Sequence, residues 1–173
     1  STVIDGDHLC DCKAEAGTPL PTIQICEGLD TAIQLRNLLV GEEPGGLWSV
    51  NPSTPAFNAA AGTFNTKAAG PNEYILTYTI SPKFSAPPCD GDTSRVQINV
   101  NPTPKADAGL DQGLGCKVVE ATLGGSATTI DPALDYNWSG RLAAVKDSKA
   151  RITTVVDSGT FILTVRYPQT GCL

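Results

Sequence analysis

An internal repeat is the feature that most constrains the fold of this 173-residue chain. The pattern Lys-Ala-acidic-Ala-Gly occurs at residues 13–17 and again at 105–109, an offset of 92 residues. In both copies a cysteine then precedes a tryptophan by 22 residues, Cys26 before Trp48 and Cys116 before Trp138. Self-similarity of this kind decides the architecture, and these markers predict two copies of one structural module.

The later markers keep the same order in both copies. Residues 74–78 match residues 161–165 at an offset of 87, and Cys89 matches Cys172 at an offset of 83. The two prolines in residues 101–104 favour a short, stiff and extended linker between the copies. The predicted organisation is therefore an N-terminal segment 1–12, a first module 13–104 and a second, incomplete module 105–173.

Polar and apolar residues alternate along several short segments. Residues 22–25, 31–35, 74–80 and 95–100 show this period of two and are bounded by turn-forming residues, which is typical of β-strands. Only residues 31–40 also fit a short helix. With 17 glycines and 13 prolines in the chain, about seven short strands per module predict an all-β fold of two immunoglobulin-like sandwiches. Trp48 and Trp138 are expected on central strands, where they would fill the two cores.

Charge and composition exclude several classes of function. A net charge of −6 with twelve scattered basic residues argues against nucleic-acid binding. No apolar run approaches the roughly 20 residues that span a bilayer. The single histidine, His8, offers no plausible Ser-His-Asp arrangement. We therefore expect a protein that is not an enzyme and that has no resident cofactor, apart from a weak indication of calcium.

Six cysteines in a small acidic chain indicate disulfides and an oxidising, extracellular compartment. One bridge in each module, closing a long loop, would contribute about 4 kcal/mol by restricting the unfolded chain. The pairs favoured on this ground are Cys26–Cys89 and Cys116–Cys172. Sequence does not fix the connectivity, and Cys10 and Cys12 remain, to pair with each other or with a neighbouring chain or domain.

Two short acidic turns are weak candidates for calcium. They place Asp5 near Asp7 and Asp90 near Asp92, but a calcium site needs at least about six oxygen ligands. An ordinary polar turn is the favoured interpretation of both. Asn137, in Asn-Trp-Ser, is a weak candidate for N-glycosylation.

The second module carries a series of motifs that point to a family. They are Ala-x-Ala-Gly-x-Asp at 106–111, Thr-Leu-Gly-Gly-Ser at 122–126, Tyr-Asn-Trp at 136–138, Gly-Thr-Phe at 159–161 and Thr-Gly-Cys at 170–172. The first module matches through Cys-Glu-Gly at 26–28, Gly-Leu-Trp at 46–48, residues 74–78 and Cys89. This layout resembles the tandem PKD-like and immunoglobulin-like repeats of giant surface proteins in Bacteroidota, including gliding-motility adhesins. The resemblance covers nearly all of the chain beyond residue 12, but Trp138 is followed by Ser-Gly rather than by the Asp-Phe-Gly-Asp-Gly of true PKD domains.

The resemblance implies export to the cell surface, by the type IX route, and a role in adhesion or in surface filaments. Asp30-Thr31-Ala32 also resembles the Bacteroidota O-glycosylation pattern, which makes Thr31 a weak candidate for modification. The start of a strand explains Thr31 equally well.

The second module ends one residue after its matching cysteine, so we expect it to lack the strand that residues 95–100 give the first. Residues at the N-terminus have the character of that strand, namely Ser1, Thr2, Val3 and Ile4. Head-to-tail assembly follows, either in a continuous array or between subunits that donate a strand. The partners would be copies of the chain, and surface glycans or other cells. The alternative is a carbohydrate-binding accessory module of a secreted enzyme.

Overall fold

The computed structural model describes residues 14–29, 31–82, 90–141 and 144–173. The fold is all-β, as predicted, and the described residues include the short 3₁₀ helices η2 (Leu35–Leu38) and η3 (Thr66–Ala68). The chain divides into two compact units, unit 1 (Ser1–Asn101) and unit 2 (Pro102–Leu173). The division falls inside the expected linker, and each unit is described below by itself.

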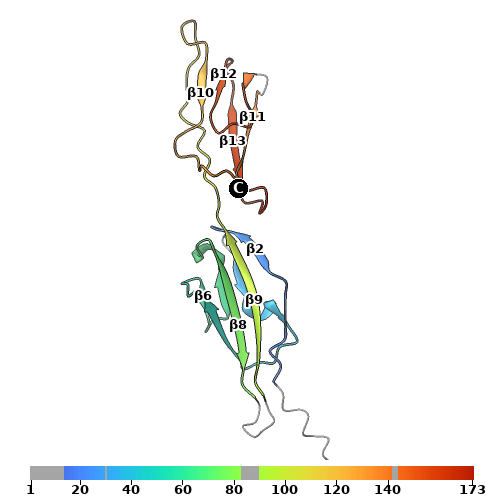
Figure 1. The fold of residues 1–173 in the computed structure, drawn as a ribbon. Coiled ribbons are helices and arrows are strands. Elements are labelled where there is room, and N and C mark those ends of the chain that lie inside the picture. Colours follow the sequence, from blue (N-terminus) through green and yellow to red (C-terminus); the bar gives the residue numbers. More distant parts are fainter. Residues whose placement is uncertain (1–13, 30, 83–89, 142–143) are drawn as a thin grey trace, which may run out of the picture. The chain divides into compact units, whose positions relative to one another are not determined.

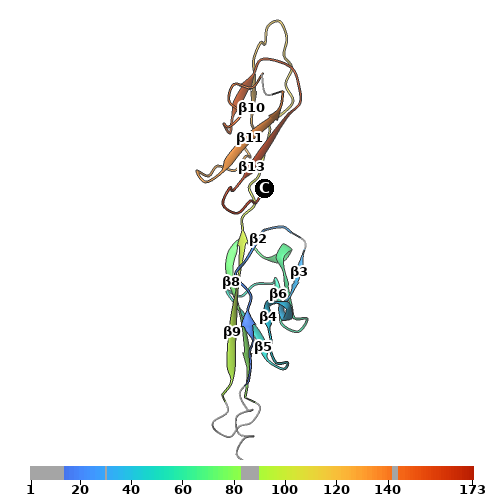
Figure 2. The same ribbon diagram turned by 90° about the vertical axis from the view of Figure 1, so that its right-hand side faces the viewer.

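Unit 1 is built from two facing sheets (Figures 1 and 2). The larger sheet has the order β2-β9-β8-β5, with β2 parallel to β9 and the other neighbours antiparallel. The smaller sheet has the order β3-β7-β6, and β1 pairs with β4. The strands are β1 (Thr18–Pro19), β2 (Ile23–Cys26), β3 (Ala32–Gln34), β4 (Leu39–Val40), β5 (Leu47–Asn51), β6 (Phe57–Asn58), β7 (Thr63–Asn65), β8 (Asn72–Ile80) and β9 (Asp92–Asn101).

The core of unit 1 forms where β8 and β9 face the smaller sheet. Alternate residues of β8 are buried, as the sequence pattern predicts: Tyr74, Leu76, Tyr78 and Ile80. Alternate residues of β9 join them: Val96, Ile98 and Val100. Because both strands expose one face and bury the other, their period-2 pattern fixes the register of the pair.

The segment 31–40, which fits both strand and helix by sequence, contains both kinds of structure. It begins as β3, passes through η2 and ends as β4. Leu35 and Leu38 of η2 are buried in the core of unit 1. The 3₁₀ turn brings both leucines, three residues apart, to the core side, whereas an uninterrupted strand would place them on opposite faces.

Unit 2 contains two pairs of antiparallel strands, β10 with β12 and β11 with β13 (Figure 1). The strands are β10 (Ala121–Leu123), β11 (Asp135–Gly140), β12 (Thr153–Val155) and β13 (Phe161–Arg166). The buried cluster among the described residues of this unit is small and consists of Leu134, Trp138, Leu163 and Val165.

The two tryptophans differ in their surroundings. Trp138 is 1% exposed, and its Nε1–H donates a hydrogen bond to the Ala150 carbonyl at 3.0 Å. Trp48 is half-buried, with its ring centroid 5.0 Å from that of Tyr78. The expected central strand is wrong for both, because β5 is the edge strand of its sheet and β11 pairs only with β13 among the described strands; the expected core position holds for Trp138.

Candidate strand-accepting edge of unit 2

The matching strands β8 and β13 differ in how many neighbours they have. In unit 1, β8 pairs with β5 along one edge and with β9 along the other. In unit 2, β13 pairs with β11, and no other described residue forms a ladder with it. An edge of this kind presents unpaired N–H and C=O groups, which are a template for another strand.

The segment that ends at the first repeated cysteine, Cys26 in unit 1 and Cys116 in unit 2, shows the same difference. In unit 1, β2 lies parallel to β9, with Ile23 opposite Ile98 and Ile25 opposite Val100, and both isoleucines pack against the core. The matching residues in unit 2 are 113–116. They belong to no described strand, apart from one isolated bridge between Gly115 and Val118, and most of them are exposed. Unit 2 therefore lacks the pairing that β9 gives β2.

The repeated Lys-Ala-acidic-Ala-Gly motif ends in both units on a glycine with a positive φ angle. Gly17 and Gly109 close it at φ angles of 81° and 88°, a region that glycine adopts without strain. Burial differs, however: Ala14 and Ala16 are fully buried, whereas their counterparts in unit 2 are exposed.

Contacts with β9 and the residues before it explain the burial in unit 1. The amide of Ala14 donates to the Asp90 carbonyl at 3.3 Å, and the amide of Ala16 donates to Asp92 Oδ2 at 2.9 Å. The Ser94 hydroxyl also donates to the Gly17 carbonyl. In unit 2, no described residue accepts a hydrogen bond from the amide of Ala106 or Ala108.

A cavity of about 400 Å³ lies within unit 2. Its lining includes Leu123 of β10, Trp138 of β11, Val155 of β12 and Phe161 of β13, and the exposed Ala108. The two strand pairs therefore leave space between them that is apolar along the strands and polar where loops 109–114 and 157–160 line it. In unit 1, three alternate side chains of β9 lie in the core between the two sheets.

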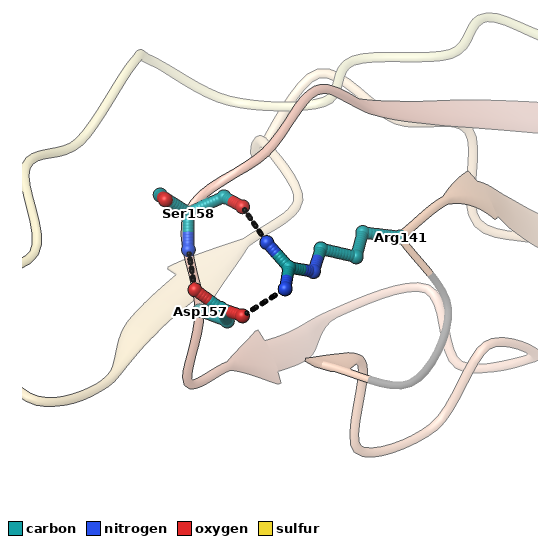
Figure 3. Close-up of polar contacts among 3 residues, drawn as sticks. All are labelled: Arg141, Asp157 and Ser158. Carbon is teal, nitrogen blue, oxygen red and sulfur yellow. Dashed lines mark hydrogen bonds and ion pairs between the residues drawn. The ribbon is translucent and has the colours of Figure 1, made fainter.

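The turn before β13 is held by a small polar cluster (Figure 3). Arg141 Nη2 lies 2.9 Å from Asp157 Oδ2, and its Nη1 donates to the Ser158 carbonyl at 3.5 Å. The amide of Ser158 donates to Asp157 Oδ1 at 2.8 Å. Both partners of the ion pair are about half exposed, so it contributes at most about 1 kcal/mol. Its effect is to position a turn that lines the cavity.

Asp107 fixes the repeated motif to unit 2. Its carboxylate accepts backbone hydrogen bonds from Gly109 at 3.0 Å and Ala127 at 3.1 Å. These bonds, in that order, lower the pKa of Asp107 from its ordinary value, and nearby Lys105 lowers it further. The motif is therefore anchored even though its alanines are exposed. Sequence analysis missed this anchor, although an acidic residue in both copies of the motif was a signal for it.

The cysteines require a correction. Cys26 and Cys172 are each disulfide-bonded, but Cys116 is a free, exposed thiol. The predicted Cys116–Cys172 bridge is therefore wrong. The physical reason is that Cys116 lies in an exposed segment without a strand ladder, which does not hold it against the end of the chain.

The predicted Cys26–Cys89 bridge involves a residue outside the described part of the chain, as do Cys10 and Cys12. Cys26 lies opposite Asn101, at the end of β9. Asp92, three residues after Cys89, begins β9, and ten extended residues span roughly 30 Å. The pairing of Cys26 with Cys89 stays a prediction.

The calcium candidates are not brought together as a site. Asp92 Oδ2 accepts from Ala16 and its Oδ1 from Thr93 at 2.8 Å, so its carboxylate binds backbone amides. No group of acidic, histidine or cysteine side chains suited to a metal occurs among the described residues. Asp5 and Asp7 lie outside that part of the chain.

The remaining candidates are placed as follows. Thr31 is exposed at the start of β3. Asn137 is half-buried within β11, and its Oδ1 accepts from Lys149 Nζ at 2.7 Å. The expected donor residues Ser1, Thr2, Val3 and Ile4, and also His8, are outside the described residues.

Comparisons with known proteins give no family for the chain. Neither a protein-family model nor a curated protein sequence matches it. None of the helices in the described residues is long and apolar enough to cross a membrane. Every aromatic side chain that the structure describes is buried or half-buried.

Proposed function

We propose that the chain is a structural or adhesive extracellular module, a repeating unit of a surface fibre or giant adhesin that is joined head to tail. The observation that carries this proposal is the open edge of β13, beside a cavity whose lining includes Leu123, Trp138 and Phe161. A two-stranded layer over a small core is marginal alone. The added strand gives that layer a third strand and covers apolar surface, so joining to the next copy would stabilise the unit.

Two sources of the strand are compatible with this proposal. In a continuous array, residues that follow unit 2 in the same chain supply it. In a polymer of subunits, Ser1, Thr2, Val3 and Ile4 of the next copy supply it by strand addition. Disulfide-bonded cysteines support an oxidising, extracellular location. The resemblance to Bacteroidota surface repeats agrees with this location.

Joining two copies in tandem tests the proposal. In the dimer, unit 2 of the first copy is followed directly by the N-terminal segment of the second. We expect the amides of β13 in that unit to exchange with solvent at least about tenfold more slowly than in the single chain. The matched control has Val3 and Ile4 of the second copy replaced by Asp.

Electron microscopy of the single chain separates the two sources. Filaments that disappear when residues 1–4 are removed indicate donated strands, whereas dispersed particles indicate an array. The proposal is overturned if the single chain stays dispersed and the tandem dimer leaves exchange at β13 unchanged.

A further inference from the structure

The open edge of unit 2 has more specific features than an unpaired strand. In unit 1, β9 and the two residues before it make four kinds of contact: they pair with the edge of β8, pair with β2, accept hydrogen bonds from two backbone amides and fill space in the core. Unit 2 has the counterpart of each of these four contact sites. Each contact site constrains the occupant in a different way. Together they define the direction, the side-chain pattern and the first residues of the strand that fits.

Direction follows from the two neighbours of β9. In unit 1 the strand is antiparallel to β8 and parallel to β2. The counterparts in unit 2 are β13 and residues 113–116. An occupant running in the same direction pairs with β13 and gives residues 113–116 the ladder that β2 has.

Side-chain pattern follows from the cavity and the core. β9 buries Ser94, Val96, Ile98 and Val100 at alternate positions and leaves polar residues between them. The strand residues that line the cavity of unit 2 are apolar, whereas its polar lining, such as Asp111 and Asp157, comes from loops. An occupant therefore needs apolar residues at every second position over the six residues of β13.

The first residues of the strand that fits are indicated by the exposed alanines of unit 2. Ala14 and Ala16 in unit 1 donate to a carbonyl of Asp90 and to the carboxylate of Asp92. The amides of Ala106 and Ala108, which have no acceptor among the described residues, are the matching donors. A carboxylate that accepts from a backbone N–H forms one of the stronger hydrogen bonds.

From these features we infer that unit 2 binds an extended peptide of the β9 type, which begins with Asp-x-Asp and continues with alternating apolar residues. The peptide lies antiparallel to β13, and its second aspartate accepts from the Ala108 amide. This inference rests on the proposed function in its continuous-array form, because Ser1, Thr2, Val3 and Ile4 contain no Asp-x-Asp and their two apolar residues are adjacent.

A synthetic peptide with the sequence of residues 90–101 is the direct probe. It is titrated into the ¹⁵N-labelled 173-residue chain, and binding is followed by amide chemical shifts. We expect saturable 1:1 binding, with the largest shifts at β13 and residues 106–116. Shifts confined to β8 and its neighbours would mean strand exchange in unit 1 and would overturn the inference.

Variants in the peptide leave the protein unchanged, so a failure to fold cannot explain the result. Asp at the Ile98 position places a charge against the apolar strand residues that line the cavity and should weaken binding at least about tenfold. Ala at the Asp92 position removes the acceptor for Ala108 and should weaken binding about tenfold. Asp at the exposed Arg95 position is the matched control and should have less than about a threefold effect.

The result separates this inference from the proposed function. No binding, or equal binding of the parent and Ile98-position peptides, overturns the inference even if the single chain forms filaments. Specific binding at unit 2 supports the inference even if the tandem dimer and the single chain give no sign of assembly, which would overturn the proposed function alone.

Discussion

Unit 1 and unit 2 share the same sequence markers but differ in how many strands pair with β8 and with its counterpart β13. In unit 1, β9 pairs with β8 and β2, buries three apolar side chains and accepts a hydrogen bond from the first segment. Unit 2 has counterparts of β8 and of the repeated motif that contains Ala16, but no described counterpart of β9. The comparison shows that in unit 1 the single strand β9 completes the sheet beside β8, fills the core and holds the repeated motif at Ala16.

Replacing each tryptophan by alanine gives the largest expected effect. Trp138→Ala removes a buried indole and its hydrogen bond, and should lower the free energy of unfolding of unit 2 by about 3–5 kcal/mol. Trp48→Ala, at a half-buried edge position, should cost unit 1 roughly half of that. Hydrogen exchange resolved by strand measures both. An equal or larger cost for Trp48 would contradict the difference in burial between the two cores.

Shortening a side chain of β9 tests how far unit 1 depends on this strand. Ile98 is fully buried, so Ile98→Ala should destabilise unit 1 by about 2–5 kcal/mol. Ile162→Ala is the matched control, because Ile162 is 58% exposed, and it should change stability by less than about 0.5 kcal/mol. Urea unfolding followed by Trp48 fluorescence in a Trp138→Phe background reports on unit 1. A loss below 1 kcal/mol for Ile98→Ala would show that β9 is not required for its core.

Two glycines make room for a polar side chain, one in each unit. A Cβ at Gly46 would lie 2.4 Å from the Tyr78 ring, and one at Gly125 would lie 1.9 Å from Asp107 Oδ2. Alanine at either position should cost about 1–3 kcal/mol, because the side chain that is displaced makes backbone hydrogen bonds. Gly113→Ala, which meets open space, is the control and should stay within about 0.5 kcal/mol. Thermal unfolding that ranks the control with the other two would refute this packing.

The smallest expected effect is a pH dependence confined to unit 2. Hydrogen bonds to Asp107 lower its pKa in the folded state, so the ionised carboxylate favours folding. This stability is fully present above the unfolded value of about 4 and is lost as pH falls through the lower folded value. Asp107→Asn should therefore flatten the acid side of the stability curve of unit 2, below about pH 5. Unfolding followed by Trp138 fluorescence measures this slope, and the unfolding of unit 1 is the internal control. Identical slopes in the parent and the variant would contradict the prediction.

Sequence alone predicted the strands that bury one face in the core and expose the other. Residues 74–80 and 95–100 alternate clearly, and the structure confirms them as β8 and β9. Residues 161–165, matched to 74–78 by the repeat, are confirmed as part of β13. A period of two is a local property, so it can be read without knowing what a strand pairs with.

Features that depend on which strands lie next to each other could not be predicted from the period of two. The edge position of Trp48 depends on the order of strands, and the free thiol of Cys116 depends on whether a neighbouring strand holds its segment. The cavity between the strand pairs and the exposure of Ala108 depend on which strands pair with β13. A sequence pattern describes one strand at a time, whereas these features belong to several.

The parallel pairing of β2 and β9 has a mechanical consequence. The first described residues of unit 1 lie beside Asp90 and Asp92, where β9 begins, and the chain leaves the unit at Asn101, where β9 ends. A pulling force on these two ends would load the four residue pairs between Ile23–Cys26 and Ile98–Asn101 in shear. Hydrogen bonds loaded in shear resist together, whereas those of a peeled hairpin break one after another. Unit 1 therefore has the strand geometry of an element that can transmit tension.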